Sequence, residues 1–429
     1  MRPIDPGLLP DGAVIGSEDR LSIAGCQALE LATEFGTPLF VYDEDHLRAR
    51  CREAVAGFGD GVAYAAKAFL CAAMARLAHE EGMQLDVATG GELRMALLAD
   101  VPPDRLILHG NNKSIAELRL GLEVGVGRIV IDSFDEMDRI EGLVAEGLPP
   151  PTVLIRVNPG IDAHTHEYLR TGAVDSKFGF GLAVGAAAQA VERASRSPAM
   201  HFKGVHAHIG SQVFETSFFE RAVSTLGPFV GLVEAEELSI GGGLGVAYVD
   251  GESAPTITEW AATVRAACSA AGIEARLLAE PGRSIVAAAA VTLYTVGTIK
   301  ELAGVRTYVA VDGGMSDNPR PVLYGSGYEA FLPRAVTAER PRMVRIVGKH
   351  CESGDVIIRN GAVPADLEVG DVLCTPVTGA YGHAMGSNYN MVRRPPVVFV
   401  RDGKARVVVR RETYEDLFAR DEGVPEPEF

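Results

Sequence analysis

The sequence predicts an α/β protein made of a TIM-like (β/α)8 barrel and a second, mostly β domain of the sandwich or barrel type. From residue 61 onward, eight short apolar runs alternate with amphipathic or alanine-rich stretches. After about residue 290 the composition changes to runs rich in Val, Thr and Tyr, with Gly, Pro and Asp between them. The length of 429 residues suits two or three domains. We therefore expect a barrel over 37–290 and a β domain over 1–36 and 291–429.

Each barrel strand is expected as a short apolar run. The eight runs are VAYAAKA, LDVAT, RLILHG, RIVIDS, VLIRVNP, KGVHAHIG, ELSIGGG and RLLAEPG. Between them lie AAMARLAHEEG, GELRMALLAD, SIAELRLGLEVG and FFERAVSTLGPFVGLVEA, whose apolar residues recur at the spacing of a helix. Active sites of such barrels are built at the carboxyl ends of the strands. The polar and glycine residues expected there are Lys67, Asp86, His109, Arg156, His208, Gly241, Gly242, Gly243 and Glu280.

The second domain is expected to consist mainly of strands. Its candidate strands are VTLYTVGTI, TYVAVDGG, MVRIVGKH, DVIIR, VLCTPV, PPVVFV and ARVVVRR. Residues 1–36 fit neither pattern and could add a strand to this domain.

Composition restricts the classes of function. The net charge of −17 opposes binding to a phosphate backbone, so we expect a small-molecule ligand and no nucleic acid. No apolar run approaches the length of a membrane span, and the first residues lack the order of a secretory signal, which predicts a cytoplasmic protein without a membrane partner. The six cysteines form no CxxC pair, and we expect them to be reduced thiols.

Lys67 lies in the apolar run GVAYAAKAFL. An unpaired ammonium group in an apolar site is costly and tends to lose its proton. A neutral lysine amine is a nucleophile for carbonyl groups. The alternative is that Lys67 simply ends its strand and reaches solvent.

Two further segments favour a chemical role for Lys67. In SIGGGLG, bare backbone N–H groups can approach an anion closely, although neither the dinucleotide pattern nor a P-loop is present. In LLAEPGRSI, Glu280 stands where a strand should end and could hold a ring nitrogen protonated, or could simply pair with an arginine. Pyridoxal phosphate requires a lysine, a binding site for its phosphate and a carboxylate that faces its ring.

The histidines do not favour a metal site. His206 and His208 alternate along one predicted strand, so we expect only one of them to face the barrel interior. His164 and His166 in AHTHEY have no third ligand at a suitable spacing. We therefore expect no metal.

The chain resembles the fold-type III, pyridoxal-phosphate-dependent amino-acid decarboxylases, and within them the group that acts on meso-2,6-diaminopimelate. The resemblance covers most of the chain, from about residue 60 to 390. It rests on YAAKAFL, LDVATGGEL, HGNNKS, VNPGIDAHTHEY, SKFGFG, HAHIGSQ, GGGLGVAY, AEPGRSI, DGGMSDNPRPVLY, GKHCESGD and GAYGHAMGSNYN.

The resemblance implies a cofactor site for pyridoxal 5'-phosphate. Lys67 would be its covalent anchor, His208 would stack on the ring, and Glu280 would pair with the ring nitrogen. Ser211, Gly242, Gly243, Gly282, Arg283 and Tyr381 would bind its phosphate. The full implied cofactor set is Lys67, Asp86, His208, Ser211, Gly242, Gly243, Glu280, Pro281, Gly282, Arg283 and Tyr381.

The resemblance also implies how the substrate is bound and protonated. The far end of the substrate carries an ammonium and a carboxylate, which suit carboxylate and guanidinium partners. The implied substrate residues are Arg283, Arg320, Tyr324, Glu352 and Tyr381. Cys351 would donate the proton that replaces CO2, since a thiol is mostly protonated near neutral pH. Cys351 and Glu352 would reach the active site of the neighbouring subunit, so the partner expected is a second copy in a homodimer with shared sites.

The implied reaction is decarboxylation to L-lysine in lysine biosynthesis. Ala384 and Gly386 depart from the residues more frequent in the family, which keeps open a decarboxylase of ornithine, arginine, carboxynorspermidine or a carrier-bound amino acid. An amino-acid racemase is a second alternative. An inert regulator is a third, against which Lys67, Glu280 and Cys351 argue.

Overall fold

The structure is a computed structural model. It describes residues 2–161 and 176–423. The chain divides into two compact units, one formed by residues 48–246 and 253–285 and the other by residues 1–47, 247–252 and 286–429. We call them the barrel unit and the β unit. Their borders differ from the expected ones at 36/37 and 290/291, and one strand described below accounts for the first difference.

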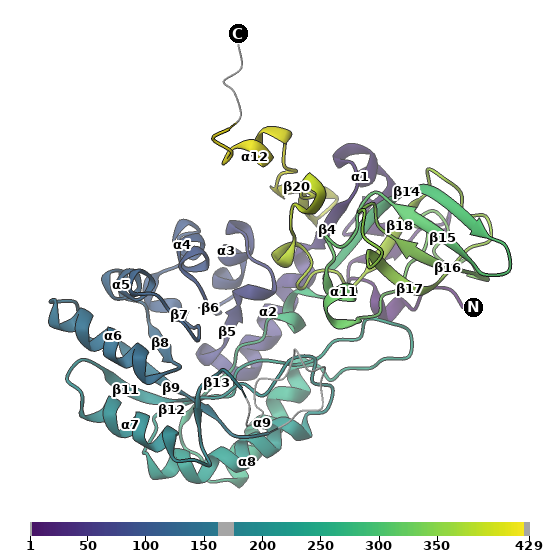
Figure 1. Cartoon of the computed structure of the whole chain (residues 1–429). Coiled ribbons are helices and arrows are strands. Elements are labelled where there is room, and N and C mark those ends of the chain that lie inside the picture. Colours follow the sequence, from purple (N-terminus) through teal and green to yellow (C-terminus); the bar gives the residue numbers. More distant parts are fainter. Residues whose placement is uncertain (1, 162–175, 424–429) are drawn as a thin grey trace. The chain divides into compact units, whose positions relative to one another are not determined.

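In the barrel unit, eight parallel strands are hydrogen-bonded side by side (Figure 1). In order they are β5 (Ala63–Ala65), β6 (Gln84–Val87), β7 (Leu106–Leu108), β8 (Arg128–Ile131), β9 (Thr152–Asn158), β11 (His201–His206), β12 (Glu237–Ser239) and β13 (Arg276–Leu278). The short β10 (Phe180–Gly181) pairs with β9. The seam between β13 and β5 is bridged by the N–H of Ala63, which donates to the carbonyl of Ala279 at 2.9 Å, and by that of Ala65, which donates to Pro281 at 3.1 Å. The eight predicted barrel strands are confirmed.

Helices alternate with these strands and surround them in Figure 1. They are α2 (Glu44–Phe58), α3 (Ala72–Glu80), α4 (Gly90–Leu98), α5 (Ile115–Val124), α6 (Phe134–Ala145), α7 (Ala186–Arg196), α8 (Ser217–Leu232), α9 (Ile257–Ala270) and α10 (Arg283–Val286). Local sequence sets several of their starts: Ser114 and Glu117 form a capping box at α5, and Thr256 and Glu259 form one at α9. The four predicted helices are confirmed as α3, α4, α5 and α8.

The barrel has an apolar interior. Ala63, Ile107, Val130 and Leu154, from four different strands, form one buried cluster. Trp260, the only tryptophan of the chain, is fully buried on α9, with its ring 4.7 Å from that of Phe58 between centroids. Such packing fixes the strand ends on which polar side chains stand.

The β unit contains an eight-stranded sheet. Along the sheet the order is β17 (Val356–Val363), β16 (Arg342–Val347), β15 (Arg306–Val311), β14 (Ala290–Leu302), β4 (Leu39–Asp43), β19 (Val397–Arg401) and β20 (Lys404–Val409), with β18 (Val372–Pro376) also paired to β14. The seven predicted strands of this region are confirmed. Its helices are α1 (Ala28–Phe35), α11 (Arg320–Tyr324) and α12 (Tyr414–Phe418).

The N-terminal region differs from the expectation in two ways. Strand β4, inside the range expected for the barrel, pairs with β14 and β19 of the β unit instead. All five of its residues are buried, so its sequence has the same continuous apolar character as a barrel strand. Before it, β1 (Ala13–Ile15), β2 (Leu21–Ile23) and β3 (Cys26–Gln27) form a separate three-stranded antiparallel sheet rather than adding a strand to the large one.

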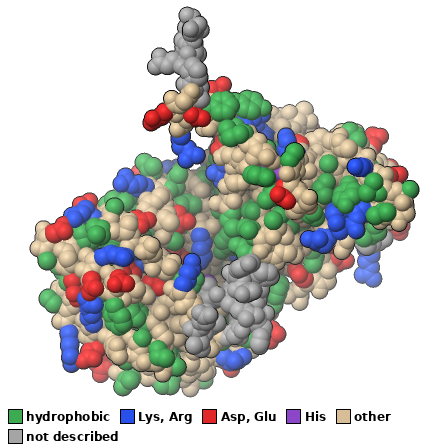
Figure 2. All heavy atoms as spheres, in the orientation of Figure 1, with side chains coloured by type: hydrophobic (Ala, Val, Ile, Leu, Met, Phe, Trp, Pro, Cys, Tyr) green, Lys and Arg blue, Asp and Glu red, His purple; other side chains and the backbone are tan. Residues whose placement is uncertain are grey.

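Acidic and basic side chains are interspersed over the face seen in Figure 2. On this face, acidic side chains therefore often lie near basic ones, although the net charge of the chain is −17. Within residues 2–161 and 176–423, no helix has the length and apolar composition that crossing a bilayer would demand.

Candidate active site

The site residues expected from the sequence fall in both units. In the barrel unit they lie in or after β5, β6, β11, β12 and β13, toward the carboxyl side of the strands, namely Lys67, Asp86, His208, Ser211, Gly242, Gly243, Glu280, Pro281, Gly282 and Arg283. The β unit carries Arg320, Tyr324, Cys351, Glu352 and Tyr381. His164 and His166 lie outside the described residues.

Lys67 does not lie in a strand. Strand β5 ends at Ala65, and Lys67 is in the 3-10 turn Ala66–Ala68, where its side chain is exposed while the flanking alanines are buried. The strand ends two residues earlier, so Lys67 is not an ammonium group within an apolar strand, and its exposure agrees with the alternative that Lys67 ends its strand and reaches solvent. Small residues surround this turn: a Cβ atom added to Gly282 would lie 3.0 Å from the Cβ of Ala65. The result is a primary amine at the rim with little side-chain bulk beside it.

Glu280 is a buried carboxylate held by hydrogen bonds from several strands. One of its oxygens lies 2.9 Å from Nε2 of His206, and the other accepts a hydrogen bond of 2.8 Å from the Ser239 hydroxyl. Nε2 of His109 is 3.4 Å from that second oxygen. Burial by itself would raise the pKa of Glu280, but the two imidazoles outweigh it and hold the pKa well below the usual range. Glu280 is therefore an anion in the barrel interior.

The titratable groups around Glu280 differ in whether their surroundings favour the charged or the neutral form. Burial, joined by the charge of Glu280, raises the pKa of Asp86, whose oxygen is 3.6 Å from Nε2 of His109. For His109 burial acts to lower the pKa, but the two carboxylates prevail and raise it. Burial lowers the pKa of His206 to about 4 in spite of Glu280. Near neutral pH His206 is thus a neutral hydrogen-bond donor, and His109 is the imidazole that the carboxylates favour as a cation.

His208 contacts the glycine segment after β12. The N–H of Gly242 donates to Nδ1 of His208 at 3.1 Å, which places the proton of the neutral ring on Nε2. Burial, Lys67 and Arg156 hold the pKa of His208 well below its usual value. Strand β11 ends at His206, so strand alternation does not extend to His208, and the expectation that only one of the two faces the interior stays a prediction.

The glycine segment lies against two neighbouring strand ends. A Cβ atom on Gly242 would lie 2.1 Å from the carbonyl oxygen of Glu280, and one on Gly243 would lie 2.2 Å from that of Gly210. Gly243 also has a φ of +112°, which favours glycine. The buried guanidinium of Arg283, which follows β13, donates to the Ser211 hydroxyl at 2.9 Å. This is a donor-rich strand end suited to an anion.

In the β unit, Arg320 is a buried guanidinium. Its side chain donates to the hydroxyls of Tyr328 and Ser326, the latter at 3.1 Å, and lies 3.8 Å above the centroid of the Tyr248 ring. No carboxylate of residues 2–161 or 176–423 forms an ion pair with it. A buried charge of this kind normally has a counter-ion.

Cys351 and Glu352 are exposed on a loop whose backbone is held by hydrogen bonds to buried or neighbouring side chains. The N–H of Cys351 donates to the side-chain carbonyl of Asn390 at 3.2 Å. The buried Asp355 accepts from the backbone N–H groups of His350 at 2.9 Å and Met315 at 2.7 Å. Tyr324 and Tyr381 are both partly exposed, and Tyr381 has a φ of 59°.

Three buried side chains are of types that bind metals. Ligand atoms of His109, His206 and Glu280 all lie within 4.8 Å of one another. The contacts of Glu280 with His206 and Ser239 have the lengths of ordinary hydrogen bonds. A hydrogen bond accounts for the contact between His206 and Glu280, whereas Nε2 of His109 lies 3.4 Å from Glu280. The sequence did not predict this cluster as a unit.

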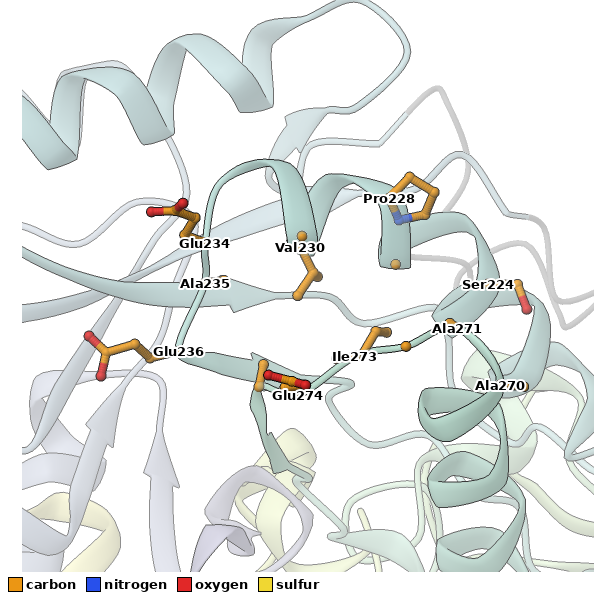
Figure 3. Close-up of a pocket in the computed structure, with 14 residues that line it drawn as sticks. Ser224, Pro228, Val230, Glu234, Ala235, Glu236, Ala270, Ala271, Ile273 and Glu274 are labelled. Atoms are coloured by element: carbon orange, nitrogen blue, oxygen red, sulfur yellow. The ribbon is translucent and has the colours of Figure 1, made fainter.

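A cavity of about 960 Å³ lies elsewhere in the barrel unit (Figure 3). Its lining includes Glu234 and Glu236, which precede β12, and Glu274, which precedes β13. Loops that precede strands lie at the amino ends of a parallel barrel, opposite the end that carries Lys67 and Glu280. This cavity is therefore separate from the candidate site.

This barrel has a lysine after its first strand, a glycine-rich segment suited to an anion after the seventh and a buried carboxylate after the eighth. These features together define a class of pyridoxal-dependent enzyme. Residues 44–287 match the family model described as "Pyridoxal-dependent decarboxylase, pyridoxal binding domain". Diaminopimelate decarboxylase of Mycobacterium tuberculosis is 45% identical over 96% of this chain and 97% of that protein. That of Bacillus subtilis is 45% identical over 94% and 95%.

Solved structures agree with this relationship. The crystal structure of diaminopimelate decarboxylase from M. jannaschii has a TM-score of 0.90 and 33% identity, covering 97% of this chain and 98% of that one. The chain belongs to the pyridoxal-dependent decarboxylases and, within them, to the diaminopimelate decarboxylase family. It is an enzyme of the carboxy-lyase type, and its cofactor is pyridoxal 5'-phosphate.

The residues of the barrel unit fit this cofactor. The exposed amine of Lys67 can react with an aldehyde, and Glu280 is an anion that can accept a hydrogen bond from a protonated ring nitrogen. The Gly241–Gly243 segment with Ser211 and Arg283 offers backbone, hydroxyl and guanidinium donors for a phosphate.

Proposed function

We propose that the enzyme removes one carboxyl group of meso-2,6-diaminopimelate as CO2 and releases L-lysine, as the last chemical step of lysine formation. The names of the relatives support this proposal, and so does an L-lysine complex of the M. jannaschii enzyme, 33% identical. The observation that carries it is the buried Arg320 guanidinium without a carboxylate partner among the described residues. A substrate with a second carboxylate would provide the missing counter-ion.

Each barrel residue has a proposed task. Bound pyridoxal phosphate supplies an electron sink for the pair left when CO2 departs. Lys67 would hold the cofactor through its amine, and Glu280 would accept a hydrogen bond from the ring nitrogen and keep it protonated. The neutral His208 would pack on the ring. The remaining residues proposed to hold or border the cofactor are Asp86, Ser211, Gly242, Gly243, Pro281, Gly282, Arg283 and Tyr381.

Residues of the β unit are proposed to act on the substrate. Arg320 binds the distal carboxylate, with Tyr324 and Tyr381 as hydroxyl donors. From the barrel unit, Arg283 is also proposed as a substrate residue. Glu352 binds the distal ammonium. Cys351 donates a proton to the carbon that has lost CO2, and its exposed position on a loop anchored by Asn390 suits a group that must meet substrate.

Substrate selection by Arg320 can be measured directly. Wild-type enzyme loaded with cofactor should release CO2 from meso-diaminopimelate and far less from L-ornithine, which lacks a distal carboxylate. Arg320→Met should lower kcat/KM for diaminopimelate by about a hundredfold, the equivalent of about 3 kcal/mol, because a charge-assisted pair in a buried site is lost. The rate with L-ornithine should change little.

Two further variants make the Arg320 result decisive. Arg320→Lys keeps the charge and should lie between wild type and Arg320→Met. Arg342→Met, which removes a half-exposed arginine paired with Glu301 in the same unit, should behave like wild type. Equal losses for both substrates in Arg320→Met would contradict the proposed role, and a wild-type preference for L-ornithine would contradict the function.

We also propose a homodimer with shared active sites in the cytoplasm. The six free thiols, five of them buried, suit a reducing compartment. For the dimer the support is the exposed position of Cys351 and Glu352, as expected of groups that meet a second copy.

Mixing two inactive variants tests the shared site. Lys67→Ala and Cys351→Ala should each be inactive, and a mixture refolded together should recover up to about a quarter of wild-type activity. Random pairing makes half of the dimers mixed, and each mixed dimer has one intact site of two. A mixture of Lys67→Ala with Glu280→Ala, both in the barrel unit, is the matched control and should stay inactive. Activity in that control, or none in the first mixture, would rule out sharing through Cys351.

A further inference from the structure

Glu280 is held by hydrogen bonds to two side chains, His206 and Ser239, that no proposed role in catalysis explains. His206 and Ser239 are direct register partners on the adjacent parallel strands β11 and β12, so their side chains leave the sheet at the same level. Glu280 follows β13, the next strand, and its backbone N–H donates to the carbonyl of Gly241 at 2.8 Å. Three successive strand ends therefore deliver the imidazole, the hydroxyl and the carboxylate to one buried point.

His206 directs its proton to Glu280. Its side chain is 1% exposed, and Nε2 is 2.9 Å from the carboxylate. Its Nδ1 atom has no hydrogen-bond partner among the described residues, so the single proton of a neutral ring is placed on Nε2. A neutral donor orients a carboxylate without taking its charge, whereas a buried cation would add a second costly charge.

We infer that His206 is a positioning residue, which with Ser239 fixes the orientation and the negative charge of Glu280 toward the ring nitrogen of the cofactor. This inference rests on the proposed function of Glu280. An anion at this point keeps the ring nitrogen protonated, whereas a neutral carboxylic acid could not accept that hydrogen bond in the same way. The charged and titratable groups that face Glu280 are Asp86, His109, Arg156, His206 and His208.

The inference is tested with His206→Leu, which removes the donor, and His206→Gln, which restores an N–H donor without an imidazole. In apoenzyme, binding of pyridoxal phosphate followed by Trp260 fluorescence should be at least about tenfold weaker for His206→Leu, since a hydrogen bond to a charged group is lost. In holoenzyme kcat should fall by about tenfold or more while KM for diaminopimelate stays within about threefold. His206→Gln should recover part of both losses.

The spectrum gives a readout that a merely structural role would not change. Loss of the donor raises the pKa of Glu280, so the pH at which the visible band of the holoenzyme changes, and the acidic limb of kcat, should both move to higher pH in His206→Leu. His201→Leu is the matched control, since His201 lies on the same strand with an exposed side chain, and it should match wild type throughout.

Two results would overturn the inference. One is wild-type cofactor affinity and an unchanged spectral pH profile in folded His206→Leu. The other is an equal loss in the Leu and Gln variants that follows only the fraction of folded protein. Failure of the proposed function is distinguishable, because wild-type enzyme would then bind the cofactor with the expected spectrum and yet release no CO2 from diaminopimelate.

Discussion

A Lys67→Ala variant is expected to lose decarboxylase activity by about a thousandfold or more, because no other group can take over the covalent step. The variant should still fold, since the Lys67 side chain is exposed and its removal leaves no cavity in the buried core. It should also lack the visible band of the lysine-bound cofactor. Treatment of wild-type holoenzyme with borohydride should fix the cofactor permanently, and mass spectrometry should find it on the peptide that contains Lys67.

The matched control for Lys67 is Lys300→Ala, an exposed lysine on β14 of the β unit. It should keep the band, the labelling and the activity. An added primary amine such as methylamine should restore part of the rate to Lys67→Ala, because it can take the place of the missing side chain. A labelled peptide without Lys67, or a visible band that persists in Lys67→Ala, would disprove the assignment.

The barrel could be predicted from the sequence because its strands and its helices have clearly different apolar patterns. Parallel strands buried on both faces are continuous apolar runs, and the helices between them repeat every three or four residues. The same rule failed for Leu39–Asp43, whose buried residues look like a barrel strand although they pair with β14 and β19. Apolar character shows that a strand is buried but does not show which sheet it joins.

The site was predictable where residue type alone determines the chemistry. Lys67, Glu280 and the Gly241–Gly243 segment could be chosen because an amine, a carboxylate and bare amides at strand ends are rare in combination. The support of Glu280 by His206, Ser239 and His109 could not be predicted, because it depends on which strand positions lie opposite each other. In the β unit, the ring of Tyr248 over Arg320 joins residues 72 positions apart, and nothing in the local sequence links them.

Lys113, in the HGNNKS segment, forms a buried ion pair with Glu136, and breaking this pair should strongly destabilise the barrel unit. The ammonium group of Lys113 lies 2.6 Å from Glu136 and donates to the carbonyls of Val130 at 2.6 Å and Gly110 at 2.8 Å. The second oxygen of Glu136 accepts from the N–H of Asp132 at 2.9 Å. Burial lowers the pKa of Lys113 and raises that of Glu136, and in each case the partner opposes the shift. Each charge is thus acceptable only because of the other.

Removing one partner of this pair should be far worse than neutralising both. Lys113→Met should lower the free energy of unfolding by about 3–5 kcal/mol, because Glu136 stays buried without a counter-ion. The double variant Lys113→Met/Glu136→Gln should recover a large part of that loss, since the Gln carbonyl can still accept from Asp132. Urea unfolding followed by the fluorescence of Trp260, which lies in the barrel unit, measures both.

The loss in Lys113→Met should depend on pH in a definite direction. Without Lys113, the pKa of Glu136 in the folded state rises further above the ordinary value of about 4.3, so the folded state binds a proton that the unfolded state has released. Stability then falls as the pH rises from the unfolded pKa through the folded one. The deficit relative to wild type should therefore be smaller at pH 5 than at pH 8, and Glu136→Gln should abolish the difference. A deficit that is the same at both pH values, or a double variant no more stable than Lys113→Met, would show that packing rather than charge governs this site.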